Sequence, residues 1–358
     1  MRGDGVAFKV TLKASGHQFE VADGETVLDA AQRAGLALPY SCRAGVCGSC
    51  KAIVLEGSFT YPRNPPSALN AAEQAQHAAL LCQAVPTSDL LLQVREVRSV
   101  EDMPRRELDV TVTARDRLAP DVVRLLLTPQ ADQPRLRWLP GQYIDVLLDD
   151  GKRRAFSLAR APHLGPELEV HVRHVAGGGF TSWVFHELKV GDTLRIGGPL
   201  GTFVPREDAE RPMILLAGGT GFAPIKALVE HFLHLGSRRP MHVYWGARTA
   251  ADLYLRELPE RWARDVPTLD FTPVVSDAVE AARAGLRPGL VHEAVLEDWP
   301  DLSGMDVYMC GPPTLIDAGR RSFADAGLPE EHLYYDSFEY APDVLEKILG
   351  SRAGIHGM

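Results

Sequence analysis

The chain has 358 residues, which is too long for one hydrophobic core of ordinary size and predicts two or three domains. Hydrophobic residues make up 45 % and charged residues 24 %, as in a soluble globular protein, and a net charge of −9 without a clustered basic surface argues against a nucleic-acid-binding protein. The N-terminal MRGDGVAFKVTLKASG lacks a signal-peptide core, and no apolar run approaches the roughly 18 residues of a membrane span, so a cytoplasmic location without a membrane partner is predicted.

The first 97 residues (1–97) predict a compact α+β domain around a cysteine-rich loop. Nine basic and nine acidic side chains balance within residues 1–98, so the acidic surplus falls in the rest of the chain. The turn Ser15-Gly16 separates the two strands of a hairpin, and Gly35 ends the helix that follows. In chain order we expect strands at 7–14 and 17–22, a helix at 25–35, a strand at 50–57, a helix near 70–80 and a strand at 89–97.

A second domain is predicted for residues 108–206. The preceding stretch 98–107, RSVEDMPRRE, is charged and contains a proline, which indicates a linker. Short strand-like runs separated by turn signals, with little helical periodicity, are typical of a small antiparallel six-stranded β-barrel. The strands are expected at 108–116, 122–129, 141–150, 153–159, 167–175 and 192–199.

Strands alternate with helices from residue 207 to residue 340 (207–340), which indicates an α/β domain with a parallel sheet covered on both faces. Such sheets bind ligands at the carboxyl ends of their strands, where this block carries the glycines 218–221 and Gly311. Residues 341–358 form a tail to which no role is assigned. Strands are expected at 212–219, 240–247, 269–275 and 305–312, and helices at 224–236, 251–265 and 314–327.

Four of the five cysteines lie in the first quarter of the chain. Cys42, Cys47 and Cys50 have the spacing C-x4-C-x2-C, and Cys82 follows after 31 further residues, which matches the ligand spacing of plant-type [2Fe–2S] proteins. Small residues between them would let backbone N–H groups approach the cluster sulfides. A zinc site or structural thiols are the alternatives, although zinc sites usually show two close pairs or added histidines. A thioredoxin-like pair, Cys47 with Cys50, would leave the other two without a role.

Two stretches of the predicted barrel are candidates for a flavin site. RRAFSL, residues 153–158, offers a cation for phosphate, a flat aromatic face and a hydroxyl for a ring nitrogen. HVRHVAGGGFTSW, residues 171–183, places bare N–H groups at a helix start, where an anion can bind. Taken alone, each of these short stretches is better explained as an ordinary barrel strand or glycine turn.

The third block carries two candidate nucleotide-binding motifs. LLAGGTGFAPIKAL, residues 215–228, predicts a strand, a glycine-rich turn and a helix, with Pro224 at the helix start, where its missing N–H costs nothing. The CGPP run that begins at Cys310 ends a later strand of the same sheet and could face the same ligand, whereas a buried small side chain is the alternative for Cys310. The histidines at 163, 174, 231 and 234 lack a set of partners at ligand spacing, and no metal site is predicted there.

In this order the elements resemble a known family, the NAD(P)H-dependent flavin reductases that carry a plant-type ferredoxin domain ahead of a ferredoxin–NADP reductase-like module. This family includes reductase components of oxygenases and CDP-6-deoxy-glucoseen reductase. The similarity covers about residues 6–340 and implies three cofactors: a [2Fe–2S] cluster, FAD, and NADH or NADPH. Phe156 takes the place of the usual tyrosine in the R-x-Y-S flavin motif, so ring packing is kept while a phenol hydrogen bond is lost.

Carried over residue by residue, the resemblance implies a set of site residues. The cluster ligands are Cys42, Cys47, Cys50 and Cys82. The cofactor-binding residues are Arg154, Phe156, Ser157, Leu158, His171, Arg173, Gly178, Gly179, Thr181, Gly219, Thr220, Gly221, Pro224, Cys310, Gly311, Pro312 and Phe338. Those next to the reacting rings are Ser157, Cys310 and, in the YYDSF segment, Phe338.

The resemblance also implies a direction of electron flow. Electrons would enter near Cys310, cross the flavin near Ser157, and leave singly through the cluster to a partner protein. That partner is expected to be an oxygenase component or a pyridoxamine-phosphate-dependent sugar dehydratase, with the stretch 56–74 closer to the latter. Asp252, in place of a basic cluster for a 2′-phosphate, favours NADH over NADPH, although Arg248 and Arg256 lie nearby. A redox sensor that holds flavin and cluster without turnover is the alternative function.

Overall fold

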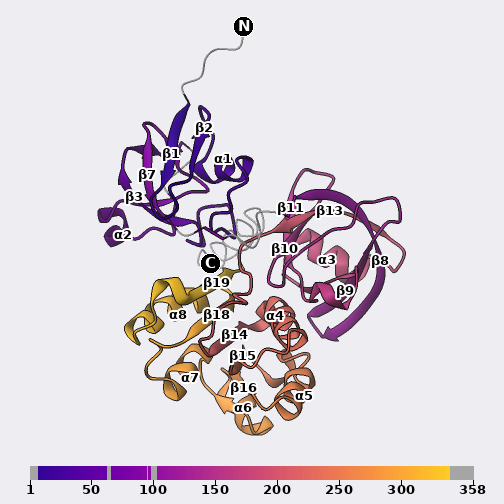
Figure 1. Cartoon of the computed structure of the whole chain (residues 1–358). Coiled ribbons are helices and arrows are strands. Elements are labelled where there is room, and N and C mark those ends of the chain that lie inside the picture. Colours follow the sequence, from indigo (N-terminus) through magenta and orange to yellow (C-terminus); the bar gives the residue numbers. More distant parts are fainter. Residues whose placement is uncertain (1–6, 63–65, 95, 98–102, 339–358) are drawn as a thin grey trace, which may run out of the picture. The chain divides into compact units, whose positions relative to one another are not determined.

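A computed structural model describes residues 7–62, 66–94, 96–97 and 103–338 (Figure 1). The chain divides into two compact units, one of residues 1–104 with 201–203 and one of residues 105–200 with 204–358. Within the described residues, no helix combines the length and the apolar character needed to cross a bilayer. The tail expected at 341–358 lies outside the described residues.

Unit 1 contains a five-stranded mixed sheet with the strand order β2-β1-β7-β3-β5. The predicted hairpin is present, since β1 pairs antiparallel with β2, and β1 also pairs parallel with β7. Apolar side chains alternate along β1, where Val10 and Leu12 are fully buried, and α1 adds Val27 and Leu28 to the same core. The elements are β1 (Phe8–Leu12), β2 (Gln18–Val21), α1 (Val27–Arg33), β3 (Lys51–Glu56), β4 (Phe59–Thr60), α2 (Ala71–Ala75), β5 (Ala78–Leu80), β6 (Val85–Pro86) and β7 (Leu90–Gln93).

The helix expected near 70–80 is shorter than predicted. It consists only of α2, which begins at a capping box between Asn70 and Glu73. Residues Ala78–Leu80 form a strand instead, because all three are buried and pair antiparallel with β3. The alanine-rich sequence favours a helix locally. Hydrogen bonding to β3, the strand after the cluster loop, makes these residues the edge strand of the sheet instead.

Unit 2 begins with a six-stranded antiparallel sheet in the order β11-β10-β13-β8-β9-β12, which confirms all six predicted strands. Its two edge strands meet at a bridge between Leu158 and Val170. The first strand starts earlier than expected, because Arg106 and Glu107, within the predicted linker, already pair with β13. The elements are β8 (Arg106–Ala119), β9 (Val122–Pro129), β10 (Tyr143–Leu147), β11 (Arg153–Ser157), η2 (Pro162–Leu164), β12 (Leu168–Arg173), α3 (Gly179–His186) and β13 (Thr193–Leu200).

The rest of unit 2 is the predicted parallel sheet, with the order β17-β16-β15-β14-β18-β19. Every residue of β14 and β18 is buried, as expected for strands covered on both faces. The elements are β14 (Met213–Gly218), η3 (Gly219–Gly221), α4 (Phe222–His234), β15 (Met241–Ala247), η4 (Ala250–Asp252), α5 (Glu257–Asp265), β16 (Leu269–Val275), α6 (Ala278–Ala284), β17 (Arg287–Pro288), α7 (Val291–Asp298), β18 (Asp306–Gly311), α8 (Pro313–Asp325), η5 (Glu330–His332) and β19 (Leu333–Ser337).

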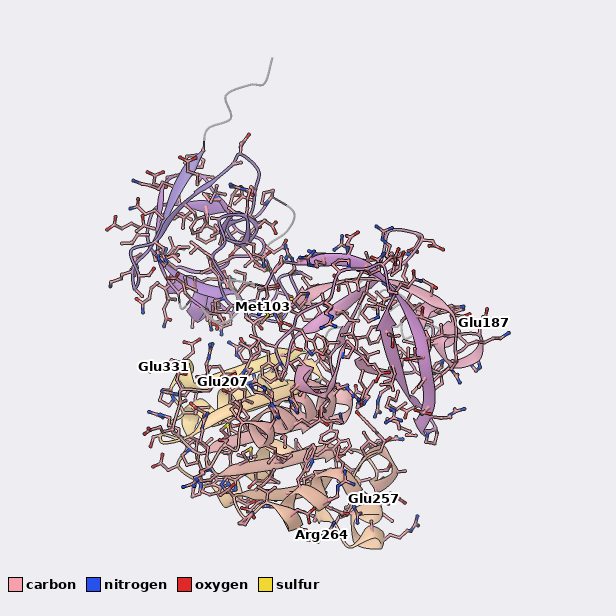
Figure 2. All side chains as sticks on the ribbon, turned by 45° about the vertical axis from the view of Figure 1, so that its right-hand side comes forward. Met103, Glu187, Glu207, Glu257, Arg264 and Glu331 are labelled. Carbon is pink, nitrogen blue, oxygen red and sulfur yellow. The ribbon has the colours of Figure 1, made fainter. Side chains whose placement is uncertain are left out.

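Four of these elements were not predicted as helices or strands, namely α6, α7, β17 and β19. In α6 only Ala281 is buried, so the sequence shows little amphipathic periodicity there. Glu187, Glu257 and Glu331 are exposed on unit 2, the unit that carries the acidic surplus of the chain (Figure 2).

Candidate functional site

The four cysteines of the predicted cluster site come together in unit 1. Cys42, Cys47 and Cys50 lie in the loop between α1 and β3, and Cys82 follows β5, which pairs with β3. The thiols form two hydrogen-bonded pairs, and the pair with Cys47 lowers the pKa of Cys42 to about 7, while Cys50 lowers the pKa of Cys82. The hydrogen bond within each pair, together with burial, raises the pKa of the other thiol, Cys47 or Cys50, well above its ordinary value. Two pairs of thiols fit the two irons of a [2Fe–2S] cluster, each of which would bind two thiolates.

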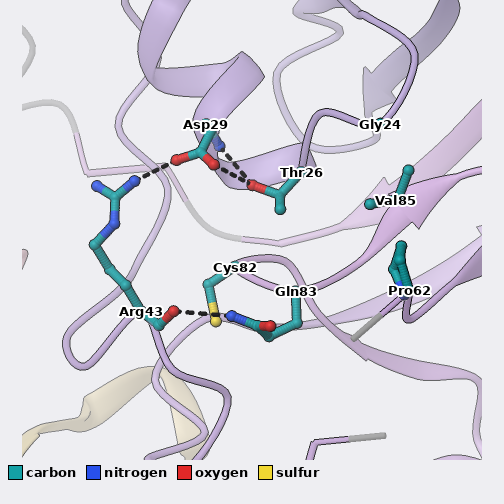
Figure 3. A pocket seen from close by; sticks show the side chains of 8 residues that line it. All are labelled: Gly24, Thr26, Asp29, Arg43, Pro62, Cys82, Gln83 and Val85. Atoms are coloured by element: carbon teal, nitrogen blue, oxygen red, sulfur yellow. Dashed lines mark hydrogen bonds and ion pairs between the residues drawn. The ribbon is translucent and has the colours of Figure 1, made fainter. Parts of the chain in front are cut away.

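Contacts around Arg43 hold the backbone of the cluster loop. Arg43 has a φ of +56°, which is costly for a non-glycine residue, and its guanidinium is paired with Asp29 of α1. Its carbonyl accepts a 2.9 Å hydrogen bond from Gln83, next to Cys82 (Figure 3). Thr26 caps α1 and donates to Asp29, so the helix N-terminus and the loop form one connected network.

Within this loop the backbone and a hydroxyl face the sulfur atoms. The N–H of Ala44 donates to the Cys42 sulfur over 3.4 Å, as expected for a loop with small side chains. The hydroxyl of Ser49 is buried without a hydrogen-bond partner. It lies near the Cys47 thiol, where it partly offsets the rise in pKa caused by Cys42 and burial, and a buried hydroxyl at this place fits a site that is completed by a cluster sulfide.

The predicted flavin residues lie on β11 and at the start of α3. Phe156 is partly buried and packs against Phe180 with the ring centroids 5.7 Å apart, whereas Leu158 is fully buried in the core of the sheet. Thr181 donates from its hydroxyl to the carbonyl of Gly178 over 3.2 Å and accepts from the N–H of Val175 over 3.1 Å. The threonine therefore fixes the shape of the glycine turn and leaves the ligand to backbone N–H groups at the helix start.

The nucleotide turn packs directly on the end of β18. A methyl group on Gly221 would lie 2.1 Å from the carbonyl oxygen of Cys310, and one on Gly218 would lie 2.6 Å from a methyl of Leu315. Gly219 has a φ of +55° and its carbonyl accepts a 2.9 Å hydrogen bond from Trp245. The two glycine-containing motifs of the predicted nucleotide site are therefore adjacent, as the sequence suggested.

A carboxylate connects the predicted flavin and nicotinamide positions. Ser157 at the end of β11 donates to Asp336 Oδ2 over 3.4 Å, and Cys310 at the end of β18 donates to the same oxygen over 4.0 Å. Burial raises the pKa of Cys310 well above its ordinary value, and the charge of Asp336 adds to this shift, so the thiol stays protonated. Phe338 lies beside this group because its N–H donates to the carbonyl of Gly311 over 2.8 Å.

Asp336 is a site residue that the sequence analysis did not name. It is 5 % exposed on β19, two positions before Phe338 in the YYDSF segment. A carboxylate as the only acidic or basic side chain of a strand next to the nominated aromatic was the available signal, since buried ionisable groups gather at functional sites.

Arg173 lies beside the nucleotide turn, whereas His171 is engaged elsewhere. The Nε and one Nη of Arg173 are buried without partners, and the same Nη would be 3.7 Å from a methyl on Gly219. Asp121 holds the other Nη over 3.1 Å. His171 is 5 % exposed, and its ring nitrogens bond Glu169 over 2.9 Å and Tyr254 over 3.0 Å, so it has no free nitrogen for a cofactor.

The histidines set aside in the sequence analysis have local partners. His231 bonds Glu207 over 2.8 Å, and His174 bonds Ser182 over 3.2 Å. His163 stacks on His234 with ring centroids 3.8 Å apart, a contact that the sequence did not indicate.

Three family models match the chain in succession. They describe a 2Fe-2S iron-sulfur cluster binding domain over residues 10–87, an oxidoreductase FAD-binding domain over 109–204 and an oxidoreductase NAD-binding domain over 215–321.

Curated relatives match almost from end to end. The CDP-6-deoxy-L-threo-D-glycero-4-hexulose-3-dehydrase reductase of Yersinia pestis is 37 % identical over 335 residues, which are 93 % of this chain and 99 % of that protein. Reductase component 1 of terephthalate 1,2-dioxygenase from Comamonas is 35 % identical and covers 90 % of this chain and 95 % of its own. A crystal structure of the Amycolatopsis cytochrome P450 reductase GcoB has a TM-score of 0.73 and 34 % identity, covering 92 % of this chain and 98 % of that one.

Proposed function

Because the chain belongs to the NAD(P)H-dependent iron–sulfur flavoprotein reductases, we propose that its electron acceptor is a sugar dehydratase and that the ends of β11, β18 and β19 form its hydride-transfer site. The activity itself follows from family membership. The chain is an oxidoreductase that takes electrons from NAD(P)H and passes them, by way of FAD and a [2Fe–2S] cluster, to a partner protein. FAD supplies the exchange between a two-electron hydride donor and one-electron acceptors.

Each cofactor has residues that fit it. Support for the cluster site comes from the two thiol pairs, and support for the nucleotide site comes from the unpartnered N–H groups of Arg173 and the close packing at Gly221. We assign Arg173 to a phosphate of the nicotinamide nucleotide, because it faces Gly219. FAD is assigned to Arg154, Phe156, Ser157, Leu158, Gly178, Gly179 and Thr181, and the nicotinamide nucleotide to Arg173, Gly219, Thr220, Gly221, Pro224, Cys310, Gly311 and Pro312.

At the hydride-transfer site, the contact of Ser157 and Cys310 with one oxygen of Asp336 carries the proposal. Asp336 orients the serine hydroxyl and the protonated thiol through two hydrogen bonds, so both side chains present fixed surfaces to the reacting rings. Phe338 is held next to them through its backbone and would cover the flavin ring from the side of β19. The site excludes water, since Ser157, Cys310 and Asp336 are all buried.

Replacing the carboxylate tests this site. In Asp336→Asn we expect the rate constant for flavin reduction by NADH to fall about 100-fold, because the orientation of Ser157 and Cys310 is lost, as for other misplaced groups at reacting centres. Anaerobic stopped-flow absorption measures that step. Asp325→Asn, an exposed carboxylate near the end of α8, is the matched control and should react like the wild type. A wild-type rate in Asp336→Asn would remove Asp336 from the site.

Support for a sugar dehydratase as the acceptor comes from the dehydrase reductase of Yersinia, which matches this chain over nearly its whole length. An oxygenase component is the second candidate, since oxygenase reductases match almost as well. The test mixes the loaded reductase and NADH with a pyridoxamine-phosphate-dependent hexulose dehydratase and its CDP-sugar, and in parallel with a terephthalate dioxygenase oxygenase component and terephthalate. Deoxysugar formation in the first mixture alone supports the proposal, and turnover only in the second overturns it.

A redox sensor without turnover finds no support among these relatives, which carry names of reductase components. We further infer three domains, 1–97, 108–206 and 207–340, with the linker from residue 98 ending before Arg106. The bridge between Leu158 and Val170 supports a closed barrel in the second of them. The cytoplasmic location stays a prediction.

A further inference from the structure

A lysine is buried in α4, the helix that follows the nucleotide turn. Lys226 is 7 % exposed, and the neighbouring Ile225 and Ala227 are fully buried. A buried ammonium group is costly unless it is paired and hydrogen-bonded, and an apolar side chain of similar size often stabilises such a position better. The partners of Lys226 therefore show which parts of the structure this buried charge connects.

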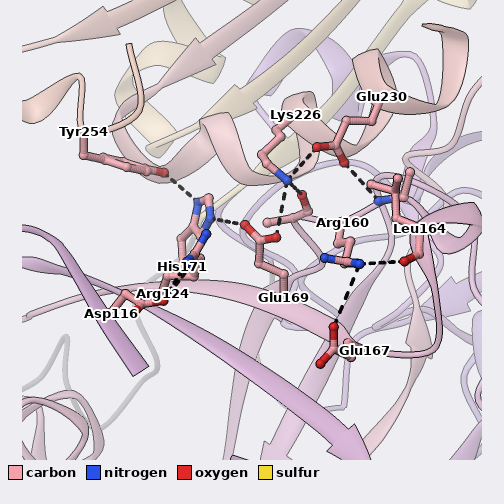
Figure 4. Close-up of polar contacts among 12 residues, drawn as sticks. Asp116, Arg124, Arg160, Leu164, Glu167, Glu169, His171, Lys226, Glu230 and Tyr254 are labelled. Atoms are coloured by element: carbon pink, nitrogen blue, oxygen red, sulfur yellow. Dashed lines mark hydrogen bonds and ion pairs between the residues drawn. The ribbon is translucent and has the colours of Figure 1, made fainter. Parts of the chain in front are cut away.

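Two of those partners belong to the antiparallel sheet that carries the flavin residues. The ammonium of Lys226 donates to the carbonyl of Ala159 over 2.8 Å and lies 3.4 Å from Oε2 of Glu169 (Figure 4). Its third partner, Glu230, lies one turn further along α4 at 2.8 Å. One ammonium group thus joins α4 to the chain after β11 and to β12.

The contacts continue on both sides of the lysine. Glu230 accepts a 3.3 Å hydrogen bond from the N–H of Ala161. Glu169 bonds His171 over 2.9 Å, and His171 bonds the hydroxyl of Tyr254, in the segment after β15, over 3.0 Å. We call Lys226, Glu169, Glu230 and their two backbone partners the Lys226 junction.

The Lys226 junction is close in the chain to both halves of the hydride-transfer site. Ala159 is two residues beyond Ser157, and Lys226 is five residues beyond Gly221. A shift of α4 against β11 therefore moves the nucleotide turn against the flavin strand. Hydride transfer requires the reacting atoms to approach within roughly 3–3.5 Å, and a displacement of about 1 Å can slow a reaction about 100-fold.

We propose that Lys226 is a positioning residue for hydride transfer, which fixes the nucleotide turn and its helix against the flavin-carrying strand through Ala159 and Glu169. The inference rests on the reductase activity of the family and does not depend on which partner accepts the electrons. It predicts that loss of the ammonium group changes the geometry between the two rings without removing either cofactor.

The main experiment uses Lys226→Met in the fully loaded protein. In anaerobic stopped-flow measurements, the limiting rate constant for flavin reduction by NADH should fall at least about 10-fold, whereas the apparent Kd for NADH from the same titration should change less than about twofold. Flavin and iron content should equal those of the wild type. Lys189→Met, which removes an exposed lysine of the same unit, should leave all of these values unchanged.

A second control separates positioning from a general loss of stability. Ile225→Val removes one buried methyl from the same helix turn but keeps every contact of Lys226. It should lower the unfolding temperature while leaving the rate constant for flavin reduction at the wild-type value. An equal slowing in Ile225→Val and Lys226→Met would overturn the proposal, because instability of α4 would then explain the effect.

Hydrogen exchange gives a readout that does not depend on activity. In Lys226→Met, amides of residues 159–161 and of the first turns of α4 should exchange faster, in the cofactor-free and in the loaded protein alike. Glu169→Gln keeps the volume and an acceptor oxygen, so we expect a smaller change in the same residues and a smaller loss of rate. If Lys226→Met does not fold, the hydrogen exchange and the rate of flavin reduction of Glu169→Gln test the proposal instead. Wild-type exchange and wild-type flavin reduction in the folded variant would overturn the proposal.

Discussion

At the scale of single residues, Glu169 shows how a buried charge can be made favourable. Burial alone would raise the pKa of this carboxyl, but the hydrogen bond from His171 and the charge of Lys226 prevail and lower it to about 2. Burial lowers the pKa of His171, although Glu169 opposes that shift. Of Glu169 and His171, the carboxylate is therefore the ionised partner at neutral pH.

This shift makes the stability of unit 2 depend on pH. A carboxyl whose pKa is lower in the folded state stabilises the fold above its ordinary pKa of 4.5, and this contribution disappears as the pH falls through about 2. It amounts to about 3 kcal/mol at full ionisation. The gap in unfolding free energy between wild type and Glu169→Gln should thus be widest near neutral pH and should close towards pH 2.

Urea unfolding followed by tryptophan fluorescence measures that gap, because all five tryptophans, at positions 138, 183, 245, 262 and 299, belong to unit 2. The matched control is Glu257→Gln, an exposed glutamate of α5, whose unfolding free energy should run parallel to the wild type at every pH. A gap for Glu169→Gln that stays constant between pH 6 and pH 3 would contradict the assignment.

At the scale of elements, the turn between β14 and α4 depends on contact with the end of β18. Gly221 has no room for a side chain, since an added methyl would lie 2.1 Å from the carbonyl oxygen of Cys310. Gly221→Ala should therefore lower the unfolding free energy by about 1–3 kcal/mol, as other overpacked sites do, and should abolish flavin reduction by NADH. Gly304→Ala is the control, because nothing lies within 4 Å of its added methyl. Normal reduction by NADH in Gly221→Ala would show that the turn can move.

We expect coenzyme choice to depend on the segment after β15. Asp252 accepts hydrogen bonds from the N–H and the hydroxyl of Thr249, and Arg256 is paired with Glu260 over 2.6 Å. Of the two arginines that the sequence offers for binding a 2′-phosphate, only Arg248, which is exposed, is then available. We expect kcat/KM for NADH to exceed that for NADPH by at least about 10-fold, since one exposed cation contributes little. Steady-state rates with ferricyanide give this ratio, and a preference for NADPH would contradict it.

At the scale of the whole molecule, charge is distributed unequally along the chain. The nine basic and nine acidic residues of 1–98 cancel, and the acidic surplus lies in the remainder. In the cluster loop the exposed side chains are those of Ala44 and Val46, with Val46 40 % exposed, while Arg43 is paired with Asp29. Among the described residues of this loop, little unpaired charge is therefore available to steer a partner.

The rate of electron transfer to the partner should therefore depend weakly on salt. We expect a change of less than about threefold between low ionic strength and about 0.3 M salt, where charges beyond roughly 6 Å are screened. Stopped-flow reduction of the acceptor over a salt series tests this. A steep fall in rate with salt would mean that a charged face guides docking, and Arg43→Gln would then show whether the cluster loop belongs to it.

Features that depend on neighbouring residues could be predicted from the sequence. The spacing of Cys42, Cys47 and Cys50 is a property of one loop, and the nucleotide turn is a property of one strand–turn–helix segment. All strands of the antiparallel sheet, and β14, β15, β16 and β18 of the parallel sheet, were predicted because their burial gives each a characteristic apolar pattern, whereas β17 and β19 were not. The strand at Ala78–Leu80 was missed, because its alanines favour a helix and only pairing with β3 makes them a strand.

Sequence alone predicted the order of the three cofactor-binding segments and the four thiols as cluster ligands, because each segment, and the spacing of Cys42, Cys47 and Cys50, is a local pattern in the chain. Only the tertiary structure placed Asp336 against Ser157, which is 179 residues away, and Lys226 against Ala159, which is 67 residues away. The physical reason is that a buried polar group must find its partner in three dimensions, and that partner need not leave any local pattern in the sequence.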